Sequence, residues 1–152
     1  MSLETDIKQK KFRNSYQKLS INLKYTSNWL GYREMDLFKE HDLTSQQYNV
    51  LRILRGQSCS GVKVSDIAER MLDKNSNASR LIDKLLAKNL AKRTSCPNDR
   101  RAVDVVITDE GLALLEAMEP ALLEIETSLS EALTEQEADQ LCTLLDKLRK
   151  SE

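Results

Sequence analysis

The sequence predicts a mainly helical fold in which two short helices, joined by a tight turn, precede a two-stranded hairpin. Three observations lead to this prediction. Between residues 62 and 108 the apolar spacing changes from helical to alternating. A polar run at residues 73–76 divides the helical part of this stretch. Long apolar stripes at spacings of three and four occupy both ends of the chain, so long helices are expected to flank the centre.

The N-terminal part of the chain is expected to form one long helix that ends near residue 39. Its apolar residues recur at roughly helical spacing: Phe12, Tyr16, Leu19, Leu23, Leu30, Leu37 and Phe38. Thr44 and Gln47 then have the spacing of a capping box, in which each side chain bonds the other residue's backbone N–H. A second helix is therefore expected to begin there, with a buried face formed by Tyr48, Val50, Leu51, Ile53 and Leu54.

The central stretch predicts a short helix over residues 64–71 and a longer one over 77–88. Asn75 or Ser76 is the expected N-cap of the longer helix. One stripe of that helix should face the core: Ala78, Leu81, Ile82, Leu85 and Leu86. Asn89 is expected to end it, because asparagine tolerates the left-handed conformation. Strands are then predicted over 90–95 and 102–107, separated by a six-residue loop from Cys96 to Arg101.

The C-terminal part predicts two more helices. Thr108 should cap the first, whose opening turn carries Asp109 and Glu110, the favourable charge at a helix N-terminus. Thr134 and Glu137 form a second capping box before the last helix. Because one small chain cannot bury so many long stripes, the terminal helices are expected to pair with a second copy. The alternative is a self-contained helical bundle.

Charge is distributed unevenly along the chain, although its net value is only −1. Between residues 74 and 101 only two residues, Asp83 and Asp99, are acidic, whereas between 109 and 140 every charged residue is acidic. The cations of the first stretch are Lys74, Arg80, Lys84, Lys88, Lys92, Arg93, Arg100 and Arg101. Such a basic helix and hairpin suit the grooves and phosphates of double-stranded DNA, which is the predicted partner. The alternative is that these are ordinary solvated helix faces.

Composition and length exclude several other classes. A chain of 152 residues is expected to form one domain, and no apolar run approaches the roughly 18 residues of a membrane span. The N-terminus does not read as a signal peptide, so a cytoplasmic protein with no membrane partner is expected. The only histidine, His41, and the three cysteines, Cys59, Cys96 and Cys142, have no metal-ligand spacing. Neither a metal nor a cofactor is therefore expected.

An enzyme is not expected either. Only four glycines are present, none in a phosphate-binding pattern, and no third group would orient a Cys–His pair. The remaining alternative is a helical module with a hairpin that binds protein through its basic face.

Several segments together resemble the MarR family of bacterial winged helix-turn-helix regulators. They are Leu43–Thr44, Gln47–Leu54, Asp66–Arg70, Ser79–Leu85, Asp99–Arg101 and Thr108–Gly111. The resemblance covers nearly the whole chain. It implies a winged helix-turn-helix DNA-binding lobe over 44–108, with a two-stranded β-wing, and helical dimerisation regions over 1–40 and 109–152. It also implies a homodimer on a palindromic operator, usually a repressor, often released by a small ligand.

The second helix of the helix-turn-helix is expected to read DNA bases from its N-terminal part. Ser76, Asn77, Ser79 and Arg80 lie away from the core-facing stripe. Arg80 can pair with guanine and Asn77 with adenine. Lys84 and Lys88 lie further along the helix and are expected to contact phosphates. For Ser76 and Asn77 the alternative is pure capping and turn chemistry.

The hairpin is the second expected contact with DNA. By resemblance, Arg101 would enter a minor groove, whose negative potential attracts arginine. Asp99 would hold that guanidinium by a salt bridge, and Arg100 would contact the backbone or the groove edge. The alternative is an exposed basic hairpin with no partner.

The effector is not specified by the sequence. By resemblance, Tyr25, Trp29 and Tyr32 on the first helix are the residues of first choice for a pocket that binds a small aromatic or lipophilic molecule. Their alternative role is core or dimer packing. Cys96 is the candidate for redox regulation, because nearby arginines would lower the pKa of its thiol.

Overall fold

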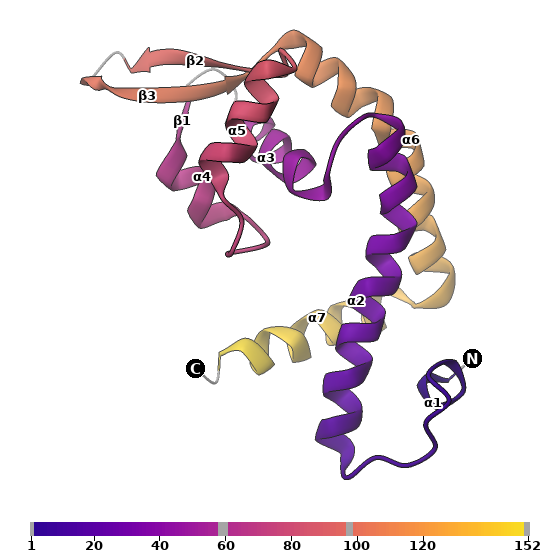
Figure 1. The fold of residues 1–152 in the computed structure, drawn as a ribbon. Coiled ribbons are helices and arrows are strands. Elements are labelled where there is room, and N and C mark those ends of the chain that lie inside the picture. The colour runs from indigo at the N-terminus through magenta and orange to yellow at the C-terminus, as the bar shows by residue number, and fades with distance from the viewer. Residues whose placement is uncertain (1, 58–60, 97–98, 151–152) are drawn as a thin grey trace.

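A computed structural model describes residues 2–57, 61–96 and 99–150, with side chains described at all of these except 95–96 and 99–103. Figure 1 shows two parts, a lobe built from the central elements and a group of long helices from both ends of the chain. The lobe contains α3 (Ser45–Arg55), β1 (Val62–Lys63), α4 (Val64–Arg70), α5 (Ala78–Ala87), β2 (Ala91–Cys96) and β3 (Asp99–Ile107). The outer helices are α1 (Leu3–Asp6), α2 (Ser15–Glu40), α6 (Asp109–Ala132) and α7 (Glu135–Arg149).

The sheet of the lobe has three antiparallel strands in the order β1-β3-β2, so the wing of the predicted fold is confirmed and one strand is added to it. In β1, Val62 pairs with Val105 and Lys63 with Asp104 of β3. A strand of two residues is too short to show alternation, and for this reason the sequence did not predict it.

The predicted six-residue loop in the wing is wrong. The strands pair as far as Cys96 opposite Asp99, after an irregularity in register between Ser95 and Cys96. Only residues 97–98 separate the strands, and they lie outside the described residues. Polar and charged residues also occur in strands that are exposed to solvent. The polarity of residues 96–101 therefore predicted a longer loop than the structure has.

One hydrophobic core holds the lobe together and includes the start of α6. The stripe expected on α5 is confirmed, with Ala78, Ile82 and Leu85 buried and Leu81 and Leu86 partly buried. The largest side chains with almost no exposure come from every layer of the lobe: Leu51, Ile67, Met71, Ile82, Leu85, Leu115, Met118, Val50 and Val105. This packing fixes the orientation of α5, and therefore the face that it presents outward.

The predicted helix starts are confirmed at three positions. Thr44 with Gln47 and Thr134 with Glu137 form complete capping boxes at α3 and α7. Thr108 accepts a hydrogen bond from the backbone N–H of Gly111 at α6. The first long helix begins later than expected, at Ser15 with Asn14 as N-cap, and the four-residue α1 precedes it.

The outer helices bury little of their apolar surface. In α2 the only buried residue is Phe38, at the end near the lobe, and α7 has none. The exposed fraction is 80% for Tyr16 and 55% for Leu144. Figure 1 shows α1 and the first half of α2 extending away from the lobe. In the described part of the chain these helices therefore leave apolar surface uncovered that a self-contained bundle, the alternative to pairing, would bury.

Candidate nucleic-acid interface

The start of α5 is fixed by the side chain of Asn77. Its Oδ1 accepts a hydrogen bond of 3.0 Å from the backbone N–H of Arg80. Asn77 is thus the N-cap, and the prediction of Asn75 or Ser76 is wrong. The amide nitrogen of Asn77 can still donate to a base edge, because capping uses only the oxygen.

Asp73 organises the turn before α5, a role that the sequence pattern did not reveal. Its Oδ1 accepts from the backbone N–H of Asn75 at 3.0 Å, and its Oδ2 accepts from the hydroxyl of Ser76 at 3.0 Å. Both residues that were expected to cap the helix are therefore engaged with Asp73. The signal was present in the sequence, because Asp commonly bonds the backbone two residues onward in turns.

A contact with α3 holds the other side of this turn. The backbone N–H of Leu72 donates to Asn49 Oδ1 at 2.9 Å. The turn is thus attached to the helix that packs beneath α5, and the N-terminus of α5 has a fixed position in the lobe.

The first turns of α5 present a polar, exposed face. Ser79, Arg80 and Lys84 are exposed, whereas Ser76 is partly buried in the turn. A shallow hollow of about 350 Å³ lies along this face, lined by Gln46, Asp73, Ser76, Asn77, Arg80, Leu81 and Lys84. The structure thus gathers four of the expected DNA-contacting residues around one surface. Arginine and lysine donors at the exposed start of a helix are suited to base edges and phosphates in a major groove.

An ion pair reduces the negative charge beside this face. Arg93 Nη2 of β2 lies 2.8 Å from Asp83 Oδ1 of α5. Asp83 is the only acidic residue within α5. Because Arg93 neutralises its charge, the other cations of this face give it a positive electrostatic potential. The same contact ties the base of the wing to α5.

Lys88 is placed differently from the expectation. Its Nζ lies 2.8 Å from Asp42 Oδ2, just beyond the end of α2, and also donates to the backbone carbonyl of Asp42. Only 29% of the Lys88 side chain is exposed. An ammonium engaged in this way is better suited to positioning α5 than to contacting a phosphate.

The end of the wing can be described only through its backbone. Asp99, Arg100 and Arg101 belong to β3, and Cys96 ends β2. Their side chains lie outside the described residues, so the roles expected for them stay predictions.

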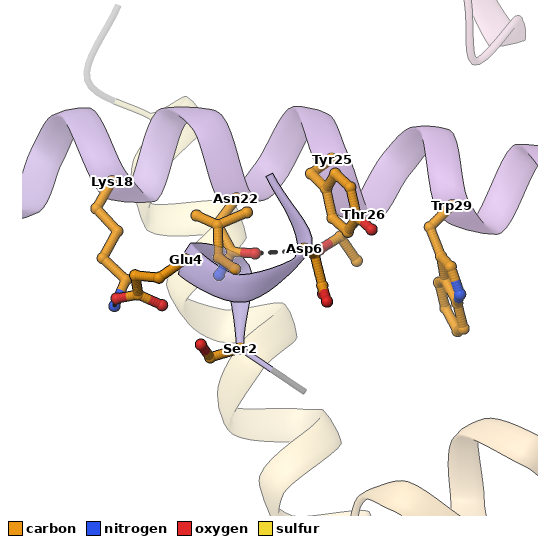
Figure 2. A pocket seen from close by; sticks show the side chains of 9 residues that line it. Ser2, Glu4, Asp6, Lys18, Asn22, Tyr25, Thr26 and Trp29 are labelled. Carbon is orange, nitrogen blue, oxygen red and sulfur yellow. Dashed lines mark hydrogen bonds and ion pairs between the residues drawn. The ribbon is translucent and has the colours of Figure 1, made fainter. Parts of the chain in front are cut away.

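The three aromatic residues expected to form an effector pocket do not line a single cavity. Tyr25 and Trp29 line a cavity of about 510 Å³ between α1 and α2, drawn in Figure 2. The Trp29 ring also lies 5.1 Å from the Arg33 guanidinium. Tyr32 lines a different cavity, of about 700 Å³, formed by α2 and the start of α3.

Membrane-spanning helices and metal sites are both absent from the described part of the chain. None of the helices there is long and apolar enough to cross a membrane. Within the same residues, no group of three or more His, Cys, Asp or Glu side chains could hold a metal ion.

Comparison with known proteins defines the class. A family model with the description "MarR family" matches residues 43–103. The transcriptional repressor MdtR of Bacillus subtilis is 34% identical over 114 residues, which cover 75% of this chain and 72% of that protein. The transcriptional regulator PecS of Dickeya dadantii is 26% identical over 115 residues, which cover 75% of this chain and 69% of that protein.

Solved structures agree with these relatives. The MepR–DNA complex of S. aureus is 25% identical with a TM-score of 0.78, covering 93% of this chain and all of that chain (100%). A MarR transcription factor from Planctomyces limnophilus is 32% identical with a TM-score of 0.66, covering 90% of this chain and 98% of that chain.

The fold and the exposed face of α5 are those of a winged helix-turn-helix DNA-binding protein. The chain belongs to the MarR family. It is a DNA-binding transcriptional regulator and not an enzyme. We call α5 the recognition helix from here on.

Proposed function

We propose that this protein is a homodimeric repressor that binds a palindromic operator and is released by a small molecule. The observation that carries the DNA-binding part is the exposed start of the recognition helix, where Arg80 and Lys84 share one surface. Arg80 would read a base edge, and Lys84 would contact a phosphate. Genomic DNA as the target would place the protein in the cytoplasm.

The homodimer is supported by the uncovered outer helices. Exposed apolar residues occur on α2, α6 and α7 and at the bend between the last two: Tyr16, Leu19, Tyr25, Trp29, Tyr32, Met35, Leu123, Leu129, Leu133, Leu141, Leu144 and Leu148. A patch on this scale is typical of an interface that a partner covers. Two-fold pairing would place two recognition helices about 34 Å apart, one turn of DNA, and would make the preferred operator an inverted repeat.

Repression is supported by the relative MdtR, which is itself named a repressor. For the effector we favour the cavity between α2 and the start of α3 over the one between α1 and α2. Its apolar lining includes Leu30, Tyr32, Met35, Phe38 and Leu43. Asp42, which pairs with Lys88 at the end of the recognition helix, is also part of its wall. A small aromatic or lipophilic molecule bound there would act on the same contact that positions the recognition helix.

Selection from randomised duplex DNA, followed by mass measurement of the complex by light scattering, tests this proposal. The expected result is an inverted repeat with half-sites about 10 base pairs apart, bound by two chains. Retention of DNA without any enriched motif, or a motif bound by one chain, would contradict it. Compounds that release the DNA should also raise the melting temperature of the protein, because they bind the folded state.

A further inference from the structure

Leu72 is an exposed apolar side chain in the turn that leads into the recognition helix. Its exposed fraction is 88%, the highest among the large apolar residues of the described chain. The other exposed side chains of this kind lie on the outer helices or at the bend between α6 and α7, where a second copy is proposed to cover them. In the described part of the lobe Leu72 is alone in this respect, and the pairing of the outer helices does not account for it.

The backbone directs this side chain outward. The preceding residue, Met71, is buried with 2% of its surface exposed, and its backbone is extended (φ −60°, ψ 138°). Successive side chains of an extended backbone point to opposite sides, so Leu72 points away from the core that holds Met71. The backbone N–H of Leu72 also donates to Asn49 Oδ1 at 2.9 Å, which keeps the residue in this orientation.

The rest of the turn is held in place as well. Asp73 accepts the two hydrogen bonds described above, one from a backbone N–H and one from a hydroxyl. Lys74 Nζ donates to the backbone carbonyl of Glu69 in α4. A rearrangement that buried Leu72 would have to break these contacts. The turn therefore presents an apolar side chain in a fixed position, and a preorganised group loses little entropy when a partner binds it.

This turn is continuous with the surface that is proposed to read DNA. Asp73, the neighbour of Leu72, lines the same hollow as Ser76, Arg80 and Lys84. Figure 1 shows the turn projecting from the lobe beside the start of α5. Because a recognition helix inserts its N-terminal part into the major groove, the turn just before that helix also lies near the base edges. Leu72 adds an exposed apolar group to this surface.

We propose that Leu72 is a further specificity-determining residue, which contacts the C5 methyl group of a thymine close to the base pair that Arg80 reads. The inference rests on the proposed placement of the recognition helix in the major groove. In that groove thymine differs from the other bases by presenting a methyl group. Contact between this methyl and the leucine removes apolar surface from water on both partners. Leu72 thus selects thymine without a hydrogen bond.

Replacement of thymine by uracil tests this contact, because uracil lacks only the C5 methyl. Each thymine of the selected operator is replaced in turn, in both half-sites, and affinity is measured by fluorescence anisotropy. With the wild-type protein, one position should lower the affinity about fourfold per half-site, the effect of burying one methyl-sized group. Leu72→Ala should lose at least as much on the thymine operator. It should show no further loss with uracil at that position.

Two more variants serve as controls. Leu72→Met keeps an apolar side chain and should keep the preference for thymine over uracil. Asn75→Ala changes an exposed neighbour in the same turn and should respond to uracil as wild type does. All three variants should melt close to the wild-type temperature, because each changes an exposed side chain.

Three results would overturn the inference. One is a Leu72→Ala variant that binds the operator as wild type does. Another is the same loss with uracil in wild type and in Leu72→Ala. The third is a weakened Leu72→Ala while wild type is indifferent to uracil at every position, since the leucine then contacts sugar or phosphate. The placement of the recognition helix fails separately, if Arg80→Ala leaves the selected motif unchanged.

Discussion

Lys88 and Asp42 join the recognition helix to the first long helix, with 2.8 Å between Nζ and Oδ2. Both residues lie where a helix ends. Asp42 adopts a left-handed conformation (φ 51°) just beyond α2, and Asn89 does the same (φ 58°) just beyond the recognition helix. Because helix C-termini carry partial negative charge, one ammonium between them stabilises both ends.

A second contact joins the recognition helix to α6. The hydroxyl of Thr108 donates to the backbone carbonyl of Asn89 at 2.7 Å and accepts from the N–H of Gly111 at 3.1 Å. The end of the recognition helix is thus connected to α2 and to α6, the helices proposed to form the dimer. A change in dimer geometry would be transmitted to the DNA-reading surface through these two contacts.

Replacing Lys88 by glutamine should weaken operator binding by about 1 kcal/mol or less, the usual contribution of an exposed ion pair. The slope of log affinity against log salt should not change, because Lys88 neutralises Asp42 and not a phosphate. Asp42→Asn should have a similar effect, and the double variant should be little worse than either single one. A slope reduced by about 0.9 in Lys88→Gln would show that Lys88 binds a phosphate after all.

Gly111 allows α6 to start close to the sheet. A Cβ there would lie 2.3 Å from the backbone oxygen of Leu90 and 2.7 Å from Ile107 Cγ1. Gly111→Ala should therefore destabilise the fold by about 1–3 kcal/mol, as overpacking does. Gly31→Ala is the matched control, since nothing lies within 4 Å of that position inside α2, and it should stabilise the helix by roughly 0.5–1 kcal/mol. Equal melting temperatures for the two variants would contradict this close approach.

Partial burial raises the pKa of Glu34, which lines the cavity between α2 and the start of α3. A carboxyl with a raised pKa in the folded state favours folding while it is protonated, and this contribution is lost as pH rises from 4.5 through the folded-state pKa. Glu34→Gln should thus be relatively more stable than wild type at pH 7 and lose that advantage toward pH 4. If the difference in melting temperature between Glu34→Gln and wild type is the same at pH 4 and pH 7, Glu34 is not desolvated.

The wing arginine is predicted to contribute through the minor groove. Arg101→Ala should lose about 1.5–3 kcal/mol of operator affinity, the range of a hydrogen bond with a charged partner. Asp99→Ala should lose less, because it only orients the guanidinium. The losses should be larger on operators with A·T-rich flanks, where the minor groove is narrow. Wild-type affinity in Arg101→Ala would show that the wing does not bind the minor groove through this residue.

Local patterns in the sequence were sufficient for much of the fold. The capping boxes at Thr44 and Thr134 were identified correctly, because the partners in each lie three residues apart. The core-facing stripe of the recognition helix was also identified from its spacing, with Ile82 and Leu85 fully buried. Asn89 was correctly expected in a left-handed conformation.

The features that the sequence did not predict are of two kinds. One depends on competition among neighbouring polar residues, and the other on contacts between residues that are far apart in the sequence. Residues 73–77 are all polar, and three of them, Asn75, Ser76 and Asn77, are suitable N-caps, so spacing could not select Asn77. The selection follows from Asp73, which engages Asn75 and Ser76. The Lys88–Asp42 contact joins residues 46 positions apart, which no local pattern reports.

Base reading by the recognition helix is the central claim, and selection from randomised duplexes with Arg80→Ala and Lys84→Ala tests it most directly. Arg80→Ala should lose on the order of 1–3 kcal/mol on the operator and relax the preference at one base pair in each half-site. Lys84→Ala should weaken binding to all sequences alike, and reduce the salt slope by about 0.9 for each phosphate that is no longer neutralised. An unchanged motif with Arg80→Ala, together with an altered motif with Lys84→Ala, would contradict this placement of the helix in the groove.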